Sequence, residues 1–230
     1  LLLSVQKASQ SGFTSHFENI GRTSNKGVEL TVETRNIVKP KFSWSTSLTL
    51  SHNKQMVEDI GSEDFVSAMN SPGNSQYMMY GYVKGRPLNA LWGFKYGGVW
   101  HNQEEIERNK VTNTYVSATT SLSPGLPRYI DTNNDGSLDQ KDLVYLGNAD
   151  PTIYGGLQNT FNIGQLKVGV YFAYSLGGKI YNYSELYMAG TYSSNQYRYM
   201  ANSWHPVRNP DSNLPRAGAV QVHVPSDLQV

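Results

Sequence analysis

Two pairs of segments in this sequence carry apolar and polar residues in alternation, which constrains the fold more than any other feature. Residues 28–35 and 42–51 have mainly aliphatic or aromatic side chains at even positions and hydroxyl or charged side chains at odd positions. Residues 166–175 repeat the pattern after the dipeptide Gly164-Gln165, with residues 153–163 before it. Because successive side chains of a β-strand point to opposite faces, the pattern predicts strands with one apolar and one polar face. The short connections predict two β-hairpins.

Three further strands are expected. Residues 76–83 and 91–100 predict a third hairpin around Gly85-Arg86-Pro87, and Leu1 to Gln6 reads as the end of another strand. The aromatic side chains of the 91–100 segment share one face; they are Trp92, Phe94, Tyr96 and Trp100.

The connections between these strands alternate in length. Short ones lie near residues 36–41, 84–89 and 163–166, and the long ones cover residues 9–26, 55–75, 101–152 and 179 onward. Short turns on one side and long loops on the other are typical of outer-membrane β-barrels, whose strands need about nine to eleven residues to cross. We therefore expect an all-β fold, an antiparallel transmembrane barrel segment with long extracellular loops.

Composition bears on the alternative, a soluble β-sandwich, which would alternate equally well. The chain has 16 Tyr, 7 Phe, 4 Trp and 21 Gly, with 16% charged residues, as barrels with aromatic girdles often do. Its apolar runs are too short for a membrane-spanning helix, so a membrane role requires strands. A formal net charge of +1 without basic blocks argues against nucleic acid, and the lack of cysteine excludes disulfides and thiolate metal sites. One structural unit is expected.

A twelve-residue loop resembles a calcium-binding loop. Oxygen-bearing side chains stand at its positions 1, 3, 5 and 12, and Gly136 stands at position 6, where a sharp turn is needed. The alternative is a set of turns in which these side chains accept hydrogen bonds from nearby backbone amides without any metal. The candidate Ca²⁺ ligands are Asp131, Asn133, Asp135, Ser137, Asp139 and Asp142.

An aromatic segment offers weak candidates for substrate binding. Residues 181–204 mix seven aromatic side chains with Asn, Ser and Gly, which suits stacking on sugars, packing on a partner or packing within the loop. The candidates are Tyr192, Tyr197, Tyr199 and Trp204. The five histidines are scattered without metal-ligand spacing or a nearby nucleophile motif, so no enzyme activity is expected.

An ordered series of short motifs resembles the SusC/RagA family of TonB-linked outer-membrane proteins. The series covers nearly the whole chain: NIGRTSNKGVEL at 19–30, KGRPL at 84–88, GGVW at 97–100, PG at 124–125, DTNNDG at 131–136, GN at 147–148, YGG at 154–156, SW at 203–204 and PR at 215–216.

The resemblance implies that residues 1–230 are part of a TonB-dependent receptor barrel of about 22 strands, about seven of them in this chain, with the plug domain and final strands absent. It implies import of glycans or peptides across the bacterial outer membrane. The implied partners are a SusD-like surface lipoprotein, TonB through the missing N-terminal region, outer-membrane lipid and the remainder of the barrel. The competing hypothesis is a soluble, calcium-dependent β-sandwich that binds carbohydrate.

Overall fold

The computed structural model describes residues 2–6, 15–19, 21–61, 66–67, 81–109, 111–113, 122–180, 182, 188 and 195–218. Contacts divide the chain into two compact units, whereas the sequence led us to expect one. We name them the sheet unit (Leu1–Val66, Tyr82–Asn89 and Asn148–Lys179) and the loop unit (Ser67–Gly81, Ala90–Gly147 and Ile180–Val230).

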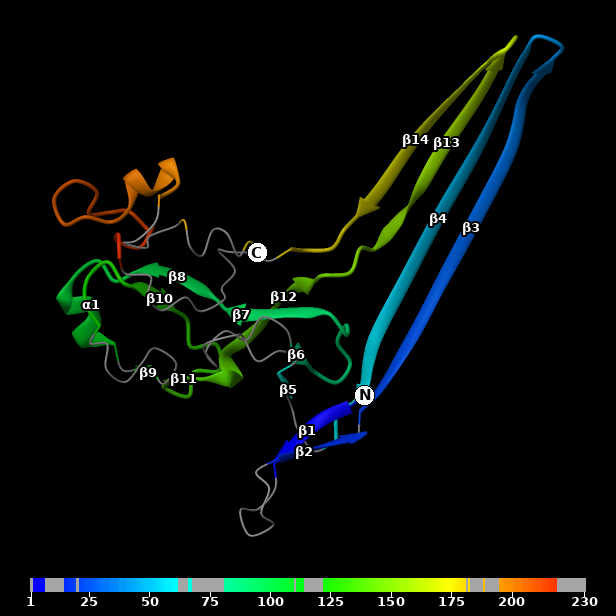
Figure 1. Cartoon of the computed structure of the whole chain (residues 1–230). Helices are drawn as coiled ribbons and strands as arrows, with labels where there is room; N and C mark the ends of the chain where they lie inside the picture. Colours follow the sequence, from blue (N-terminus) through cyan, green and yellow to red (C-terminus); the bar gives the residue numbers. More distant parts are fainter. Residues whose placement is uncertain are drawn as a thin grey trace. The chain divides into compact units, whose positions relative to one another are not determined.

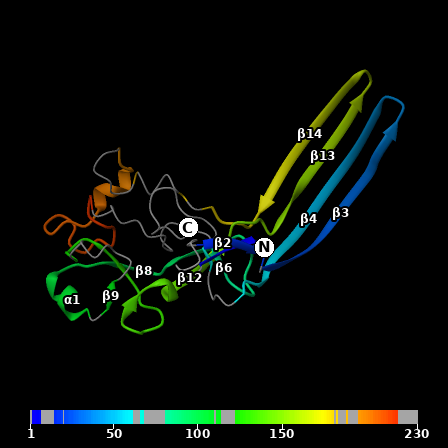
Figure 2. The same cartoon turned by 60° about the horizontal axis from the view of Figure 1, so that its bottom comes forward.

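Four long strands form one antiparallel sheet in the sheet unit: β3 (Arg22–Lys39), β4 (Phe42–Asp59), β13 (Ile153–Ile163) and β14 (Leu166–Leu176). Their order is β14-β13-β4-β3, and they lie side by side in both Figure 1 and Figure 2. Both predicted hairpins are confirmed. The sheet also joins the hairpins to each other, because β4 pairs with β13 although residues 60–152 lie between them in the chain.

The two hairpins differ in length. β13 and β14 have 11 residues each, whereas β3 and β4 have 18 each. The pairing of β13 with β4 ends at Tyr154 and Ser51. Beyond that point β4 continues to pair with β3 as far as Asp59, with a register shift between Thr23 and Arg22. Eleven residues suffice for a tilted strand to cross the hydrocarbon layer, so the extension of β3 and β4 exceeds what a crossing requires.

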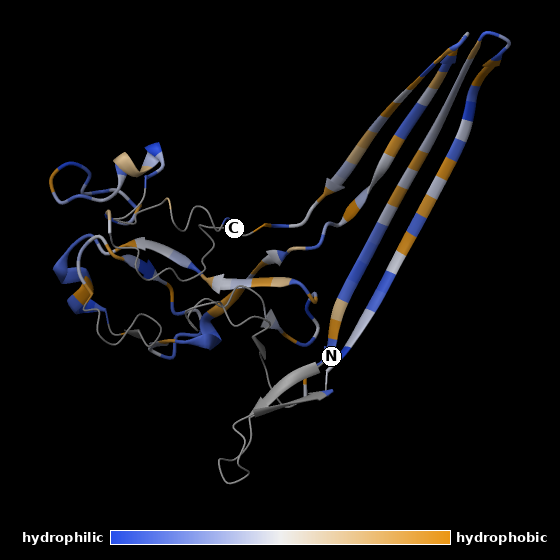
Figure 3. Cartoon of the chain, in the orientation of Figure 1, coloured by the Kyte–Doolittle hydropathy of each residue, from blue (hydrophilic) through white to orange (hydrophobic). Residues whose placement is uncertain are grey.

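The register separates the side chains of this sheet into an apolar and a polar face. Paired residues of antiparallel strands share a face, and one such row is Val32, Leu48, Leu157 and Phe172. The next row, on the opposite face, is Glu33, Ser47, Gln158 and Tyr171. Figure 3 shows the resulting alternation of hydropathy along the strands.

The apolar face is exposed in this chain. Leu30 is 51% exposed and Phe172 is 59% exposed, values that rule out a buried protein core on that face of the described sheet. Exposed apolar rows of this extent indicate that the face contacts another protein surface or a membrane.

Both short turns lie at the same end of the sheet. Lys39 and Ile163 both pair with Phe42, so the β3–β4 turn and the β13–β14 turn are neighbours. The amide of Gly164 donates a 2.8 Å hydrogen bond to the carbonyl oxygen of Lys41, which links the two turns directly. Gly164 has a φ of 61°, which a residue without a side chain adopts at little cost in this two-residue turn.

A small buried core lies at the C-terminal end of β4. Val57 and Ile60 are fully or almost fully buried, and Tyr82 and Leu88 pack against them. The amide of Val57 donates to the carbonyl of Arg86 at 2.9 Å, and the amide of Gly85 donates to the carbonyl of Val57 at 2.8 Å. The Gly85-Arg86-Pro87 segment therefore packs along β4 and does not connect two wall strands.

The predicted third hairpin is wrong. Residues 76–80 lie outside the described residues, and β6 is only Gly81–Tyr82, which pairs with β5 (Val66–Ser67). The 91–100 segment is divided into β7 (Ala90–Phe94) and β8 (Tyr96–Val99), which pair with β12 (Leu143–Asn148) and β10 (Pro127–Tyr129). Three of its aromatic side chains, Trp92, Phe94 and Trp100, are at most 8% exposed and therefore do not face lipid. Phe94 and Trp100 belong to cores of the loop unit.

The remaining elements are short. β1 (Leu2–Gln6) pairs antiparallel with β2 (Ser15–Asn19), which confirms the strand expected at the start of the chain. In the loop unit, β9 (Thr112–Asn113) pairs in parallel with β11 (Ser137–Leu138), and α1 (Gln103–Arg108) and the 3₁₀ turns η2 (Gln140–Asp142) and η3 (Arg198–Asn202) complete the order. The predicted number of about seven wall strands stays a prediction.

Candidate functional site

The polar face of the sheet carries a shallow hollow lined by charged, hydroxyl and amide side chains. It has a volume of about 560 Å³, and its lining includes Glu33, Arg35, Ser45, Ser47, Gln158 and Thr160. The alternation of β3, β4 and β13 places these side chains on one face, as the sequence predicted for the residues of β3 and β4. Such a surface offers donors and acceptors to water or to a polar solute.

The apolar face contains one polar row that satisfies itself. Asn36 donates through Nδ2 to Thr46 Oγ1 at 2.7 Å, and Thr46 in turn donates to Asn159 Oδ1 at 2.7 Å. The indole of Trp44 donates to the same Asn159 oxygen at 2.9 Å and stacks on Phe161, with ring centroids 5.8 Å apart. Polar groups in an apolar medium are costly unless they are hydrogen-bonded, and these bonds reduce that cost.

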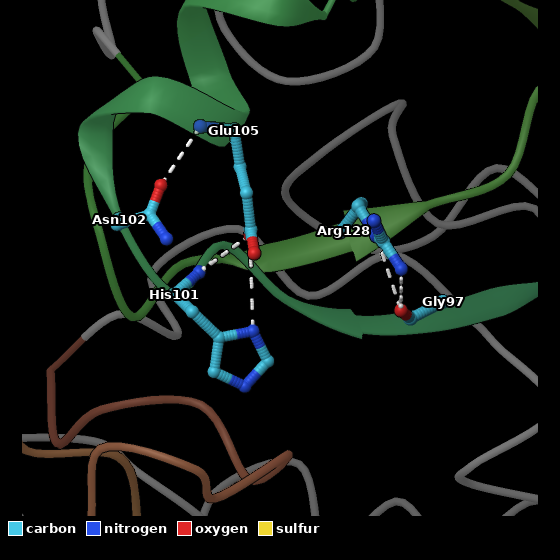
Figure 4. Close-up of polar contacts among 5 residues, drawn as sticks. All are labelled: Gly97, His101, Asn102, Glu105 and Arg128. Atoms are coloured by element: carbon cyan, nitrogen blue, oxygen red, sulfur yellow. Dashed lines mark hydrogen bonds and ion pairs between the residues drawn. The ribbon is translucent and has the colours of Figure 1, made fainter.

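In the loop unit, the start of α1 lies beside the β8–β10 pair (Figure 4). Asn102 caps the helix by accepting a 2.9 Å hydrogen bond from the amide of Glu105, and the Glu105 carboxylate accepts one from the amide of His101, also at 2.9 Å. The first bond satisfies an amide that a helix start leaves without an intrahelical partner, and the second ties Glu105 to the residue before the cap. His101 Nδ1 lies 3.8 Å from Glu105 Oε2.

Arg128 is held in place by β8. Its Nε and Nη2 donate to the carbonyl oxygen of Gly97 at 3.1 and 2.7 Å, and its guanidinium lies 5.6 Å from the ring centroid of Trp100. Trp100, Glu105 and Arg128 are among the residues that line an open hollow of about 480 Å³. A cation over an aromatic face beside a carboxylate offers polar and stacking contacts to a solute.

Tyr96 lies between this region and residue 213. Its hydroxyl donates a 2.6 Å hydrogen bond to the carbonyl oxygen of Asn213. Burial raises the pKa of Tyr96 well above its ordinary value, and the nearby Arg128 charge acts in the opposite direction.

The predicted calcium loop is held by hydrogen bonds from its own backbone. Asp131 accepts from the amides of Asn134 and Gly136 at 2.7 and 2.9 Å, and Asp135 accepts from that of Ser137 at 2.9 Å. Asp142, which is fully buried, accepts from the amides of Thr132 and Asp139 at 2.8 and 2.9 Å. In the same loop, Asn133 Oδ1 accepts a hydrogen bond from the Asp135 amide, and Asp139 Oδ1 accepts one from the Lys141 amide.

These contacts correspond to the metal-free alternative. In the described part of the chain, no group of three or more His, Cys, Asp or Glu side chains is arranged to hold a metal ion. The donor set therefore does not fit a metal centre built from carboxylates in this conformation, and calcium binding stays a prediction of the sequence.

The three aromatic candidates that the structure describes do not line one common pocket. Tyr192 lies outside the described residues. Tyr197 and Tyr199 stack with ring centroids 5.7 Å apart, which is packing within the loop, and Tyr199 is 38% exposed. Trp204 is 8% exposed and lines a separate pocket.

Sequence reasoning missed the arginines of the loop unit. Arg128, Arg208 and Arg216 line its hollows but belong to no motif that indicates binding. Their neighbours come from distant parts of the chain, so no local pattern in the sequence indicates these hollows.

Among the described residues, no helix has the length and apolar character to cross a membrane. No family model matches the sequence. The chain is 31% identical over 229 residues to TonB-dependent receptor P26 of Formosa agariphila, covering 96% of this chain and 22% of that protein. It is 26% identical over 221 residues to TonB-dependent receptor P3 of the same organism, covering 94% and 21%. The chain thus spans about a fifth of the length of the curated relatives it matches.

Solved structures show the same fold. The RagAB peptide transporter matches with a TM-score of 0.67 at 17% identity, over 98% of this chain and 23% of that one. The RagAB peptide importer in its closed-closed state matches with a TM-score of 0.64 at 17% identity, over 97% and 23%. The chain therefore belongs to the TonB-dependent receptors of the bacterial outer membrane, not to an enzyme family, and it has the fold of a SusC/RagA-like barrel segment.

Proposed function

We propose that this chain supplies part of the barrel wall and of the extracellular loops of an outer-membrane importer of glycans or peptides. The importer works with a SusD-like surface lipoprotein and takes its energy through TonB. The names of the relatives support a TonB-dependent receptor, and the similar solved structures are described as a peptide transporter and importer.

The observation that carries the proposal is the two-faced sheet of the β3–β4 and β13–β14 hairpins. Its apolar face is exposed, and its polar face carries a hollow lined by charged, hydroxyl and amide side chains. A barrel wall needs this division, since one face meets lipid and the other meets the lumen. The outer edges of β3 and β14 would pair with the remainder of the barrel, because unpaired strand edges are not tolerated in hydrocarbon.

The position of the turns gives the wall its orientation. Both short turns lie at the same end of the strands. At the opposite end, β4 is followed by residues 60–152, after which the chain returns to the sheet as β13. Outer-membrane barrels have short periplasmic turns and long extracellular loops. We therefore assign the end of the sheet with the Lys41 and Gly164 turns to the periplasm, and the loop unit to the cell surface.

Cysteine labelling of the full-length protein in isolated outer membranes tests this assignment. The segment contains no cysteine, and Ser47 and Leu48 are adjacent on β4 but face opposite sides. We expect a charged, membrane-impermeant maleimide to label Ser47→Cys through the lumen, and Leu48→Cys to react only with a lipid-soluble maleimide. Equal labelling of both by the charged reagent, or recovery of the protein in the soluble fraction, would contradict the proposal.

Uptake itself needs a separate measurement in cells. We expect import of the growth substrate to require both TonB and the full-length protein. Uptake of a panel of oligosaccharides and short peptides, compared with and without TonB, then identifies the substrate class. Unchanged uptake of every panel member after deletion of the receptor gene would refute the importer function.

A further inference from the structure

A pocket of about 390 Å³ in the loop unit has a cationic lining. Its walls include Trp204, His205, Arg208, Asn209 and Arg216. The two arginines are the charged residues in this lining, and no carboxylate stands among the lining residues to neutralise them. It shares no lining residue with the Trp100–Arg128 hollow.

The frame of the pocket is tightly built. The amide of Arg216 donates to the carbonyl of Gly125 at 2.9 Å, and the amide of Trp204 donates to the carbonyl of Leu214 at 2.8 Å. Gly125 has a φ of 86°, and a Cβ at this position would lie 2.5 Å from Trp204 Cε3 and 2.9 Å from Arg216 Cβ. Only glycine fits there, and its absence of a side chain lets Trp204 and Arg216 come together.

The 205–209 turn sets the second wall. The backbones of His205 and Asn209 exchange hydrogen bonds of 3.3 and 3.1 Å. His205 Nδ1 accepts from the amides of Val207 and Arg208, both at 3.2 Å, so these contacts assign the ring proton to Nε2. The imidazole therefore presents an N–H donor on the side away from the turn.

The two arginines bring hydrogen-bond donors to the pocket. Arg216 uses one nitrogen on Ser123 Oγ at 3.1 Å, and Arg208 is exposed with no ion-pair partner among the described residues. The indole nitrogen of Trp204 is buried and has no acceptor within the described structure. The arginine donors that these contacts leave over are available to a ligand that supplies acceptors.

We propose that this pocket binds a carboxylate of the imported substrate, with Arg208 and Arg216 as its direct partners. The inference rests on the proposed import function and names the chemical class of the substrate. A guanidinium pairs with a carboxylate through charge-assisted hydrogen bonds, and paired N–H groups match its two oxygens. The carboxylate comes from a peptide C-terminus or from a uronic acid of a glycan, two sources that present the same group.

Calorimetry on the purified full-length protein in detergent tests the proposal. The probes are tetra-alanine with a free C-terminus against its C-terminal amide, and digalacturonate against neutral digalactose. We expect the acidic member of one pair to bind at least about tenfold more tightly than its neutral partner, and Arg208→Gln to remove that preference. Arg198→Gln, an exposed arginine on η3 outside the pocket lining, is the matched control and should leave the preference unchanged.

Three results would overturn the inference. One is equal binding of acidic and neutral probes in both pairs by the wild type, and another is an unchanged preference in Arg208→Gln. The third is loss of co-purification with the surface lipoprotein in Arg208→Gln while probe binding is unaffected, which would make the pocket a docking site for an acidic side chain of that partner. In each case TonB-dependent uptake by the wild type would persist, whereas its absence would refute the import function instead.

Discussion

The hydroxyl of Tyr174 donates a 2.6 Å hydrogen bond to the carbonyl oxygen of Thr49, across the intervening strand. Tyr174 belongs to β14 and Thr49 to β4, so the tyrosine side chain spans β13 at Gly155, which pairs directly with it. On the opposite face, the ring of Tyr171 lies over Gly156, where a Cβ would come within 2.5 Å of its hydroxyl. The two adjacent glycines therefore let one tyrosine cover β13 on each face.

We predict that Gly155→Ala destabilises the barrel by about 1–3 kcal/mol, because the new Cβ would collide with the Thr49 carbonyl oxygen and the Tyr174 hydroxyl. Tyr174→Phe should cost about 0.5–1.5 kcal/mol through the lost hydrogen bond. Urea unfolding in detergent or lipid measures both. The matched control is Gly169→Ala on β14, where a Cβ would meet no atom within 4 Å. An equal loss in the control would contradict this explanation.

A charge introduced on the apolar face of β4 should destabilise the protein far more than a charge on its polar face. We predict that Leu48→Lys costs about 2–4 kcal/mol, since it places an ammonium in the hydrocarbon layer. Ser47→Lys, one residue away on the polar face, should change the free energy of unfolding by less than about 0.5 kcal/mol. Folding of the full-length protein into lipid vesicles compares them. A larger loss for Ser47→Lys would mean that the faces are assigned the wrong way round.

The 131–142 loop should depend on Asp142 whether or not calcium is present. This buried carboxylate accepts hydrogen bonds from three loop amides, those of Thr132, Asn133 and Asp139. We predict that Asp142→Ala lowers the free energy of opening of the loop by about 1.5–3 kcal/mol even in EDTA. Hydrogen exchange of the loop amides measures the change.

The same experiment decides on the calcium site. If calcium binds, its addition slows exchange in the wild type and not in Asp135→Ala. The Asp135 carboxylate is exposed, and among the described residues it accepts hydrogen bonds only from the Ser137 amide and the Asn133 side chain. If the loop is only a set of hydrogen-bonded turns, calcium changes neither protein.

Tyr96 should make the loop unit sensitive to alkaline pH. Burial raises the pKa of Tyr96, so the folded unit holds the hydroxyl proton more tightly than the unfolded chain does. The resulting stability is fully present below the unfolded value near pH 10 and is lost as the pH rises through the folded value. We expect the urea midpoint to fall less between pH 9 and about pH 11.5 in Tyr96→Phe than in the wild type. Identical slopes would contradict the assignment to Tyr96.

The sequence predicted the sheet better than it predicted the loops. Alternation identified β3, β4, β13 and β14 because side-chain period reports directly on strands with two different faces. The same criterion failed for residues 91–100, where aromatic residues at even spacing belong to β7 and β8 inside a packed unit. Periodicity records that a face is apolar, but it does not record whether lipid or protein covers it.

The candidate sites divide in the same way. The two-residue period of the strands predicts which polar residues line the wall hollow. Trp204 was a candidate because the segment 181–204 is rich in aromatic residues. Arg208 and Arg216 were not, because their pocket forms only when Gly125 brings Trp204 and residue 216 together. Contacts between residues this far apart leave no local pattern in the chain.

The sequence by itself determined the strand type, the turns at Gly164 and near Pro40, the two faces of the wall and the resemblance to a receptor family. These are properties of neighbouring residues and of their order. Only the tertiary structure decided that β4 pairs with β13, that Tyr174 reaches Thr49 over Gly155, that the aromatic 91–100 segment is buried and that the Asp131–Asp142 carboxylates accept backbone amides. These facts depend on which distant segments meet in space, and that is set by the free energy of the whole fold and not by any local pattern.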